Sequence, residues 1–268
     1  MLKDITLGQY FPGNSRIHQL DPRTKLCMVV LYIVALFLAK SWVSYGLVLA
    51  FLLTCIHIST IPVKTIKRGL RPVWFIVVFT GVLNLFFTQG TREIVTIFGW
   101  TLTWEALERA FFMVIRIMML ITGTFLMTYT TSPIALTDGL ESLLGPLKKL
   151  HFPVHELSMM MCIALRFIPT LIEETDKIIS AQKARGADFE SGNLMDRARA
   201  LVPILVPLFI SAFRRADELA IAMECRCYQG GEGRTKMKIL RYSKWDYEAY
   251  AIGGLLILAV SLLRPFGL

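Results

Sequence analysis

The sequence has few charged residues for its length, and its longest apolar runs are almost free of them. Of the 268 residues, 18% are charged and 54% are hydrophobic, whereas a typical soluble domain carries about 25% charged residues. Such a chain has too little polar surface to cover an ordinary soluble domain. The composition indicates an integral membrane protein with several helices that cross the bilayer.

Acidic residues are the scarcer of the two charge types. The chain has 20 Asp and Glu against 29 Lys and Arg, which gives a formal net charge of +9. Nucleic-acid-binding proteins gather their cations into one stripe with interleaved aromatic side chains, and this sequence does not show that pattern. Much of the basic excess lies between apolar runs, as in the cytoplasmic loops of membrane proteins. The expected surroundings are a lipid bilayer, and nucleic acid is not expected as a partner.

Motifs that carry chemistry are also missing. The chain has no Gly-x-x-x-x-Gly-Lys-[Ser/Thr] phosphate-binding loop, and "GGEGRTK" has the wrong spacing for one. The apolar runs hold no central carboxylate of the kind that ion-coupled transporters use. Arg116 is the one well-embedded charge, and we expect it to reach the membrane interface or to pair with a neighbour. We therefore expect no catalytic residue and no cofactor-binding residue in this chain.

Metal and disulfide sites are not indicated either. His151 and His155 are four residues apart, but Pro153 lies between them and the pattern is not His-Glu-x-x-His. The five cysteines show no paired framework. Cys225 and Cys227 would face different sides of a helix, so joint metal or redox use would need an unwound helix end. No metal ligand is predicted.

Five apolar runs approach the roughly 20 helical residues that a bilayer crossing requires. They lie at about Leu26–Ala39, Val43–Ile61, Pro72–Thr88, Ala110–Thr131 and Tyr247–Leu263. We therefore predict an all-α integral membrane protein with about five transmembrane helices. Four would form an N-terminal membrane domain over residues 1–131, and one a C-terminal helix over residues 246–268. Residues 132–245 mix charged with apolar residues and predict a domain outside the bilayer.

The loops predict the orientation of these helices. "DPRTKL" precedes the first apolar run, "VKTIKRGLRP" separates the second from the third, and both are basic. The loop between the third and fourth runs is slightly acidic and rich in aromatic residues. Because basic loops stay in the cytoplasm, the N-terminus and residues 132–245 are expected to be cytoplasmic.

Two long amphipathic helices are predicted within residues 132–245, after a short helix that begins at Ser132 and breaks at Gly145. The first runs from His155 to about Ala187 and the second from about Leu194 to Tyr228, each with apolar residues at helical spacing. "LVPILVPLF" within the second helix is short and contains two prolines. It favours an embedded or bundle-buried helix over a membrane crossing.

Each of these helices ends on an arginine between two small residues. The first end is Ala184, Arg185 and Gly186, and the second, 226 − 185 = 41 residues later, is Cys225, Arg226 and Cys227. As plain helix ends they are well formed, because a cation near the C-terminus complements the helix dipole and glycine is favoured just beyond it. The same residues also suit a binding tip, because small neighbours permit close approach and a guanidinium binds a carboxylate at two points. The residues alone leave both interpretations open.

The chain resembles the transmembrane T component of energy-coupling factor transporters, the family that includes the cobalt-transport protein CbiQ. The resemblance covers essentially the whole chain and rests on "GQYFPGNSRIHQLDPRTKL", "LRFIPTLIEETDKIISAQKARGADF" and "RRADELAIAMECRCY". In that family two long cytoplasmic coupling helices each end in an Ala-Arg-Gly-type motif that docks into an ATPase subunit. The resemblance places the first motif on Ala184, Arg185 and Gly186. It places the second on Cys225, Arg226 and Cys227, which depart from Ala-Arg-Gly at both flanks.

The resemblance implies a non-catalytic coupling subunit of an ATP-driven importer of the ABC type in the plasma membrane. Its partners would be two ATPase subunits, which bind the ATP, and an integral membrane S component that captures a vitamin or a metal ion. Movement of the coupling helices would reorient the S component and release its cargo inside. The alternative is a stand-alone secondary transporter or channel, which would need an ion or substrate site within the membrane, and the residues show none.

Overall fold

The computed structural model describes residues 10–87, 93–97, 100–187, 189, 193–231 and 239–263. The chain divides into two compact units. We call the first, Leu140–Ile239, the crossed-helix unit, and the second, Gly8–Gly139 with Leu240–Leu268, the bundle unit. The last helix of the sequence therefore packs in the same unit as the first ones.

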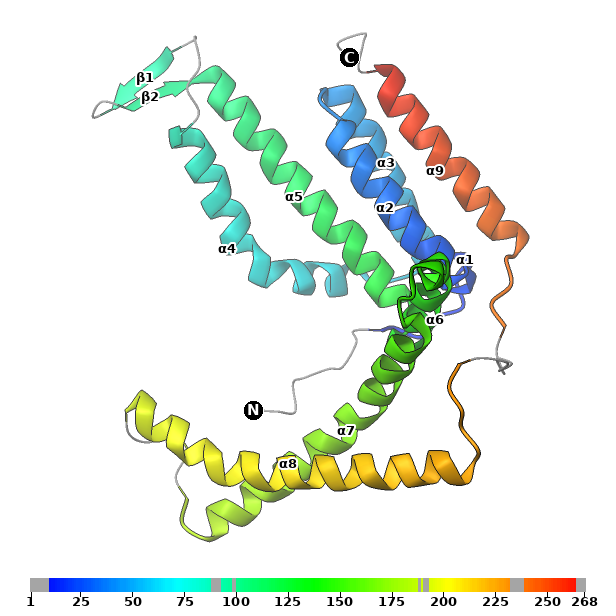
Figure 1. Cartoon of the computed structure of the whole chain (residues 1–268). Helices are drawn as coiled ribbons and strands as arrows, with labels where there is room; N and C mark the ends of the chain where they lie inside the picture. Colours follow the sequence, from blue (N-terminus) through cyan, green and yellow to red (C-terminus); the bar gives the residue numbers. More distant parts are fainter. Residues whose placement is uncertain are drawn as a thin grey trace. The chain divides into compact units, whose positions relative to one another are not determined.

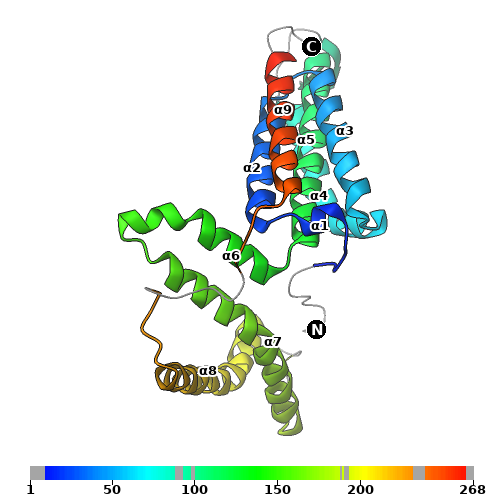
Figure 2. The ribbon, with the colours of Figure 1, turned by 90° about the vertical axis from the view of Figure 1, so that its right-hand side faces the viewer.

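The bundle unit is built from long helices. Helices α2, α3, α5 and α9 run side by side, and α4 packs along α5 (Figures 1 and 2). The elements are α1 (Arg16–Gln19), α2 (Pro22–Leu38), α3 (Trp42–Ser59), α4 (Val63–Phe87), α5 (Trp104–Thr130), α6 (Pro133–Leu143), whose last residues belong to the crossed-helix unit, and α9 (Lys244–Leu263).

The core of the bundle unit is narrow, and most of its apolar side chains face outward. One buried cluster joins α2, α3, α5 and α9 through residues such as Leu36, Val48, Met119 and Val260. Large apolar side chains elsewhere on these helices remain exposed, for example Phe75 at 77%. Helices that are apolar on both the packed and the open side belong in a hydrocarbon surrounding, because water would oppose such exposure.

Four helices in the described part of the chain are long and apolar enough to cross a membrane, namely α3, α5, α7 and α9. Three of them coincide with predicted spans. The predicted span in α2 has only 17 residues, and α4 carries four cations near its start. Helix α7 is also long and apolar enough to cross a membrane, although only 6% of its most apolar 18-residue segment is buried within the chain. The prediction of an all-α membrane protein is confirmed, and the four candidate spans among the described residues agree with the approximate count of five.

Two features of the bundle unit differ from the predicted loops. Glu93–Ile97 and Trp100–Thr103 form a two-stranded antiparallel hairpin, β1–β2, in the segment between α4 and α5. "VKTIKRGLRP", predicted as a loop between two spans, is helical and forms the start of α4. Its Lys, Arg, Ile and Leu residues sustain a helix despite a single glycine, and Pro72 lies inside the helix instead of starting it.

The crossed-helix unit contains the two long helices that the sequence predicts. A 3₁₀ helix (Gly145–Leu150) precedes α7 (Val154–Ala184), and α8 (Leu194–Cys225) follows it. Both long helices are confirmed, each ending about three residues earlier than predicted. Asn193 and Asp196 form a capping box at the start of α8, which satisfies two of its otherwise unpaired N–H groups. The segment between the two helices contains "ESGN" (Glu190–Asn193), whose residue types predict a turn and a helix cap, and all of it except Asn193 lies outside the described residues.

The stretch "LVPILVPLF" in α8 is mostly exposed. Within it only Ile204 is buried, whereas Phe209 is 65% exposed. Of the two expected settings, burial among other helices of this chain is therefore wrong, and embedding in the bilayer stays a prediction. The apolar residues between flanking cations suggested burial by neighbouring helices, but α7 is the helix that packs on α8, and it covers only one side of it.

Candidate functional site: two crossed helices with matched tips

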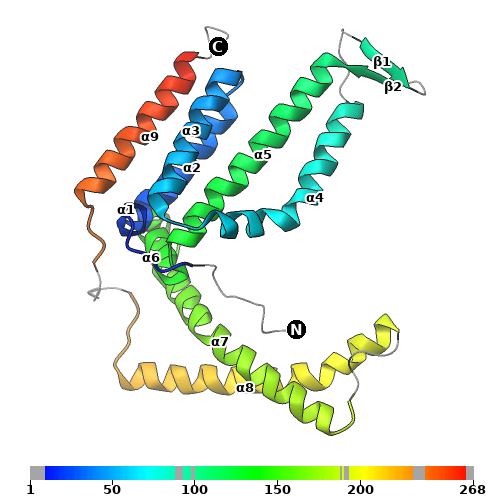
Figure 3. The ribbon, with the colours of Figure 1, turned by 180° about the vertical axis from the view of Figure 1, so that it is seen from behind.

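Helices α7 and α8 cross and touch partway along their lengths (Figures 1 and 3). Near this crossing, Arg215 of α8 lies 2.9 Å from a carboxylate oxygen of Glu174 of α7. Ser211 donates a hydrogen bond to the other oxygen of Glu174. The Arg215 guanidinium also lies over the ring of Phe167, 5.6 Å from its centre. Glu174 and Arg215, which we call the crossing pair, therefore join the two helices through charge, hydrogen bonds and a cation–π contact.

A second contact follows from the prolines of α8. Pro207 has no N–H, so the carbonyl of Pro203 lacks its usual helical partner. The side-chain amide of Gln182 donates a hydrogen bond to that carbonyl at 3.4 Å. The last turn of α7 is thus tied to the part of α8 where the proline leaves an acceptor free.

The six residues predicted as binding tips lie at the ends of these helices. Ala184 is the last residue of α7, and Arg185 caps it with φ −87° and ψ 5°. Cys225 is the last residue of α8, and Arg226 caps it with φ −93° and ψ 12°. Beyond each arginine the backbone turns left-handed, with φ 87° at Gly186 and φ 55° at Cys227.

The backbone hydrogen bonds of the two tips match one by one. The N–H groups of Gly186 and Ala187 donate to the carbonyls of Lys183 and Gln182, both at 3.0 Å. In α8, 41 residues later, the N–H of Cys227 donates to the carbonyl of Glu224 at 2.9 Å, and the N–H of Tyr228 donates to the carbonyl of Met223 at 3.1 Å. Both ends are Schellman motifs. The similarity inferred from six residues is therefore a similarity of backbone geometry.

Both arginines are exposed, as are the small residues beside them. Because the Schellman turn satisfies carbonyls at the helix end through the backbone, the arginine side chains are not needed for that purpose. A guanidinium on an exposed, rigid helix tip can bind a carboxylate of another molecule at two points. The helix-end and binding-tip interpretations are therefore compatible, because the backbone ends the helix and leaves the side chain free to bind.

The crossing pair stands at equivalent positions of the two helices. Glu174 and Arg215 are 41 residues apart, the same shift that superposes the two tips. Eleven residues, or about 17 Å of helix, separate the crossing position from the arginine in each helix (185 − 174 and 226 − 215). The sequence pattern gives no sign of this contact, because the residues at the two equivalent positions carry opposite charges. Glu173 and Lys177 are four residues apart on α7, a spacing that favours an ion pair, but both are exposed and none of the ion pairs between described residues joins them.

The tips differ in strain, which gives a testable prediction. A residue other than glycine in the left-handed region costs roughly 1–2 kcal/mol, so Cys227→Gly should raise the unfolding temperature in detergent by about 3 °C. Cys225→Gly is the matched control, because glycine inside a helix costs about 1 kcal/mol and should lower it. Shifts of the same sign in both variants would contradict this explanation.

Other singled-out residues have structural roles. Arg116 Nε donates to the hydroxyl of Tyr45 at 2.7 Å, and Nη2 donates to the carbonyl of Ala39 at 3.3 Å. Ala39 caps the end of α2, where carbonyls lack helical partners. The expectation that Arg116 pairs with a neighbour is confirmed.

His151 and His155 have separate structural roles. His155 Nδ1 lies 3.1 Å from Glu141, whose other oxygen accepts a hydrogen bond from Ser158, and within the crossed-helix unit these contacts join the last turn of α6 to the start of α7. His151 ends the 3₁₀ helix. In the described ranges, no three His, Cys, Asp or Glu residues are grouped closely enough to hold a metal ion. Cys225 and Cys227 are exposed free thiols.

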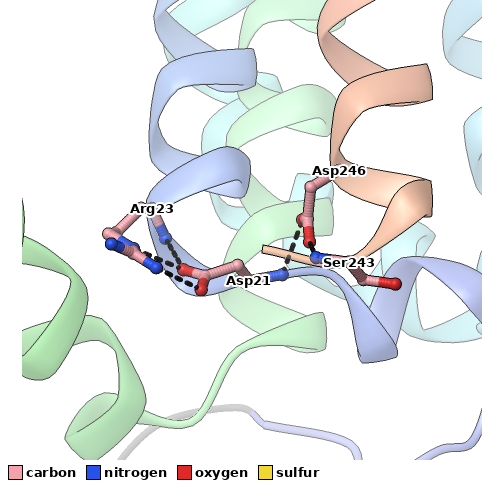
Figure 4. A network of polar contacts seen from close by, with 4 residues as sticks. All are labelled: Asp21, Arg23, Ser243 and Asp246. Carbon is pink, nitrogen blue, oxygen red and sulfur yellow. Dashed lines mark hydrogen bonds and ion pairs between the residues drawn. The ribbon is translucent and has the colours of Figure 1, made fainter. Parts of the chain in front are cut away.

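A polar clasp at the start of the bundle unit was not foreseen. The buried Asp246 of α9 accepts hydrogen bonds from the backbone N–H groups of Asp21, at 2.9 Å, and Ser243, at 2.6 Å (Figure 4). Asp21 in turn accepts from the side chain and backbone of Arg23. Burial opposes ionisation of Asp21, but these hydrogen bonds and the charges of Arg23 and Lys25 outweigh it and lower its pKa. The clasp fixes the start of α9 beside the start of α2.

The fold and these helices define a class, a helical membrane protein that presents two matched helix tips. Comparison with known proteins specifies it further. The family model described as cobalt transport protein, CbiQ, matches residues 13–237. The energy-coupling factor transporter transmembrane protein EcfT of Thermosediminibacter oceani is 55% identical over 98% of this chain and 99% of its own length. Those of Ruminiclostridium cellulolyticum and Bacillus subtilis are 53% and 47% identical over 92% and 98% of this chain, and over the same shares of their own lengths.

The chain belongs to the CbiQ family of transport proteins, and within it to the energy-coupling factor transporter transmembrane proteins. It is therefore the membrane component of a transporter, as the resemblance noted from its sequence motifs indicated.

Proposed function

We propose that this chain couples ATP hydrolysis by two ATPase subunits to the reorientation of an integral membrane S component that delivers a vitamin or a metal ion. Arg185 and Arg226, with the small residues beside them, would each dock into one ATPase subunit. ATP would bind to those subunits, and this chain would have no catalytic residue. In this proposal residues 132–245 form a cytoplasmic coupling domain, and residues 1–131 and 246–268 lie in the plasma membrane.

The observation that carries the proposal is the equivalence of the two tips. Two helices end in the same hydrogen-bonded turn and expose an arginine at the same place. They also contact each other near the crossing pair, whose two members each lie eleven residues before the arginine of their own helix. Two equivalent tips suit two equivalent partners. A cation at a helix C-terminus complements the helix dipole, but that role does not require the same residue at the same place in two helices or the equal spacing, so plain capping leaves the equivalence without a reason.

Exposed apolar surface supports an integral membrane partner. Helix α8 leaves a row of large apolar side chains uncovered, among them Leu205, Phe209 and Phe213. A monomer rarely leaves a contiguous apolar surface without a binding role. An S component, itself apolar on the outside, could cover such a surface as the helices move.

Copurification tests the proposal. When the tagged chain is coexpressed with the two ATPase subunits of its organism, both should remain bound through purification in detergent. Liposomes that contain the full complex and an S component should take up cargo only when ATP is supplied. Transport by this chain alone in liposomes, with no bound ATPase, would instead identify it as a stand-alone transporter or channel.

A further inference from the structure

The start of α4 forms an arm that diverges from the rest of the helix. Figures 1 and 3 show that α4 turns sharply along its length, so that its first part runs across the bundle and the rest runs beside α5. Pro72 lies inside the helix, and a proline both removes a helical hydrogen bond and displaces the preceding turn. We call the residues before it, 63–71, the basic arm.

One side of the basic arm is anchored in the bundle unit. Ile66 is buried in a cluster with Tyr129 of α5, and Leu70 packs against the same cluster. Gly69 permits the close approach, because a Cβ there would lie 2.7 Å from the Tyr129 hydroxyl and 2.9 Å from the Phe125 ring. The arm is therefore a fixed part of the bundle, with a defined outward side.

The other side of the arm carries four cations. Lys64, Lys67, Arg68 and Arg71 follow the spacing i, i+3, i+4 and i+7, which places them along one stripe of the helix, and all four are exposed. Helix α4 contains no Asp or Glu. None of the ion pairs found between described residues involves these cations. This basic stripe thus presents four positive charges that no described carboxylate pairs with.

The stripe lies where the apolar surface of α4 begins. Directly after it, Trp74, Phe75 and Phe79 are all more than half exposed. Tryptophan is typical of the boundary between hydrocarbon and headgroups, and an exposed apolar helix face belongs among acyl chains. The arm itself runs across the direction of the bundle helices, as a segment lying along a membrane surface would.

We propose that the basic stripe of α4 is a binding site for anionic phospholipids. The headgroup phosphate would lie against the Lys and Arg side chains, and the acyl chains would lie along the exposed aromatic and aliphatic face that follows Pro72. This continuity favours lipid over an acidic protein, because one molecule with an anionic head and an apolar tail matches both parts of the same helix. Bound lipid would hold the arm in the plane of the membrane surface.

The test compares lipid binding by the full-length chain purified in mild detergent. Native mass spectrometry would measure the affinity for dioleoyl-phosphatidylglycerol and dioleoyl-phosphatidylcholine, which share their acyl chains. The anionic lipid should bind at least about tenfold more tightly, since each Lys or Arg near an anionic surface contributes roughly fivefold. Changing all four stripe residues to Gln should bring the two affinities to within about twofold.

Matched variants keep the result interpretable. A control variant with Lys148, Lys149, Lys177 and Arg214 changed to Gln removes four exposed cations from the other unit, and it should retain the preference. A swap of Lys for Arg and Arg for Lys within the stripe preserves charge and should also retain it. The partial variants Lys64→Gln with Lys67→Gln, and Arg68→Gln with Arg71→Gln, should each lose part of it, which keeps the test valid if the fourfold variant misfolds.

Three outcomes would overturn the proposal. The fourfold and both partial variants could keep the full preference for phosphatidylglycerol, or the control variant could lose as much as the stripe variant. Alternatively, the stripe variant could bind both lipids as the unchanged chain does but lose a copurifying protein, which would identify an acidic protein as the partner. ATPase association should not change in the stripe variant, so failure here is separable from failure of the proposed function.

Discussion

Changing Arg185 and Arg226 together to Glu is expected to abolish association with the two ATPase subunits while the chain still inserts into the membrane. Each guanidinium is exposed at a helix tip and, as proposed, binds a carboxylate of one ATPase. Removing one partner of a desolvated, hydrogen-bonded charge pair at an interface costs roughly 100-fold in affinity, and reversing the charge adds repulsion. Copurification from a coexpression strain measures the effect.

The controls for this change are built into the same helix ends. Lys183→Glu alters another exposed cation, two residues from Arg185, and should weaken association less than either single arginine change. The Schellman turns are made by backbone atoms, so the helices should remain intact by circular dichroism. If the double variant still retains both ATPases at normal levels, the docking role of the tips is wrong.

Neutralising either member of the crossing pair is expected to weaken ATPase association although neither residue is near a tip. Glu174→Gln and Arg215→Gln each remove the 2.9 Å ion pair between the two helices. The side chains are only about one quarter exposed, 26% and 25%, so solvent screens the pair less than a fully exposed one. Loss of the contact would let the helices shift at their crossing, and a tip about 17 Å away would move further than the crossing itself.

A double-mutant cycle distinguishes this positioning role from a general loss of stability. Each single change should reduce ATPase affinity by about tenfold, and the double change should cost no more than either single one, because one interaction is removed in all three. Glu173→Gln with Lys177→Gln changes a neighbouring exposed carboxylate and ammonium on α7 and should have little effect. Additive losses from Glu174 and Arg215 would show that the pair does not act as a unit.

The class of protein and the long helices of the crossed-helix unit follow from sequence pattern alone. Apolar runs, basic loops and helical spacing each depend on neighbouring residues, and local preferences decide them. The positions of Arg185 and Arg226 at helix ends were predictable for the same reason, since Gly186 and the small flanking residues mark a helix end within one turn. The helical arm of α4 was missed because a proline after a basic segment also indicates a loop.

Two contacts between distant segments, the crossing pair of the candidate site and the clasp of the bundle unit, could not be predicted from the sequence pattern. Glu174 and Arg215 are 41 residues apart, and Asp21 and Asp246 are 225 apart. Glu174 and Arg215 are not identical residues, so their equivalent positions are not visible as a sequence repeat. Only the packing of α7 against α8 brings one pair together, and only that of α2 beside α9 forms the clasp.

The sequence by itself determined that the chain lies in a membrane, that two long amphipathic helices interrupt its apolar runs, and that each ends on an arginine. These features are set by solvation and by backbone preferences within a few residues. Tertiary structure decided that the two helices cross near Glu174 and Arg215. The helix-end arginines, Arg185 and Arg226, therefore lie the same number of residues, eleven, beyond the crossing. That equivalence depends on where two helices touch, which is a property of their packing.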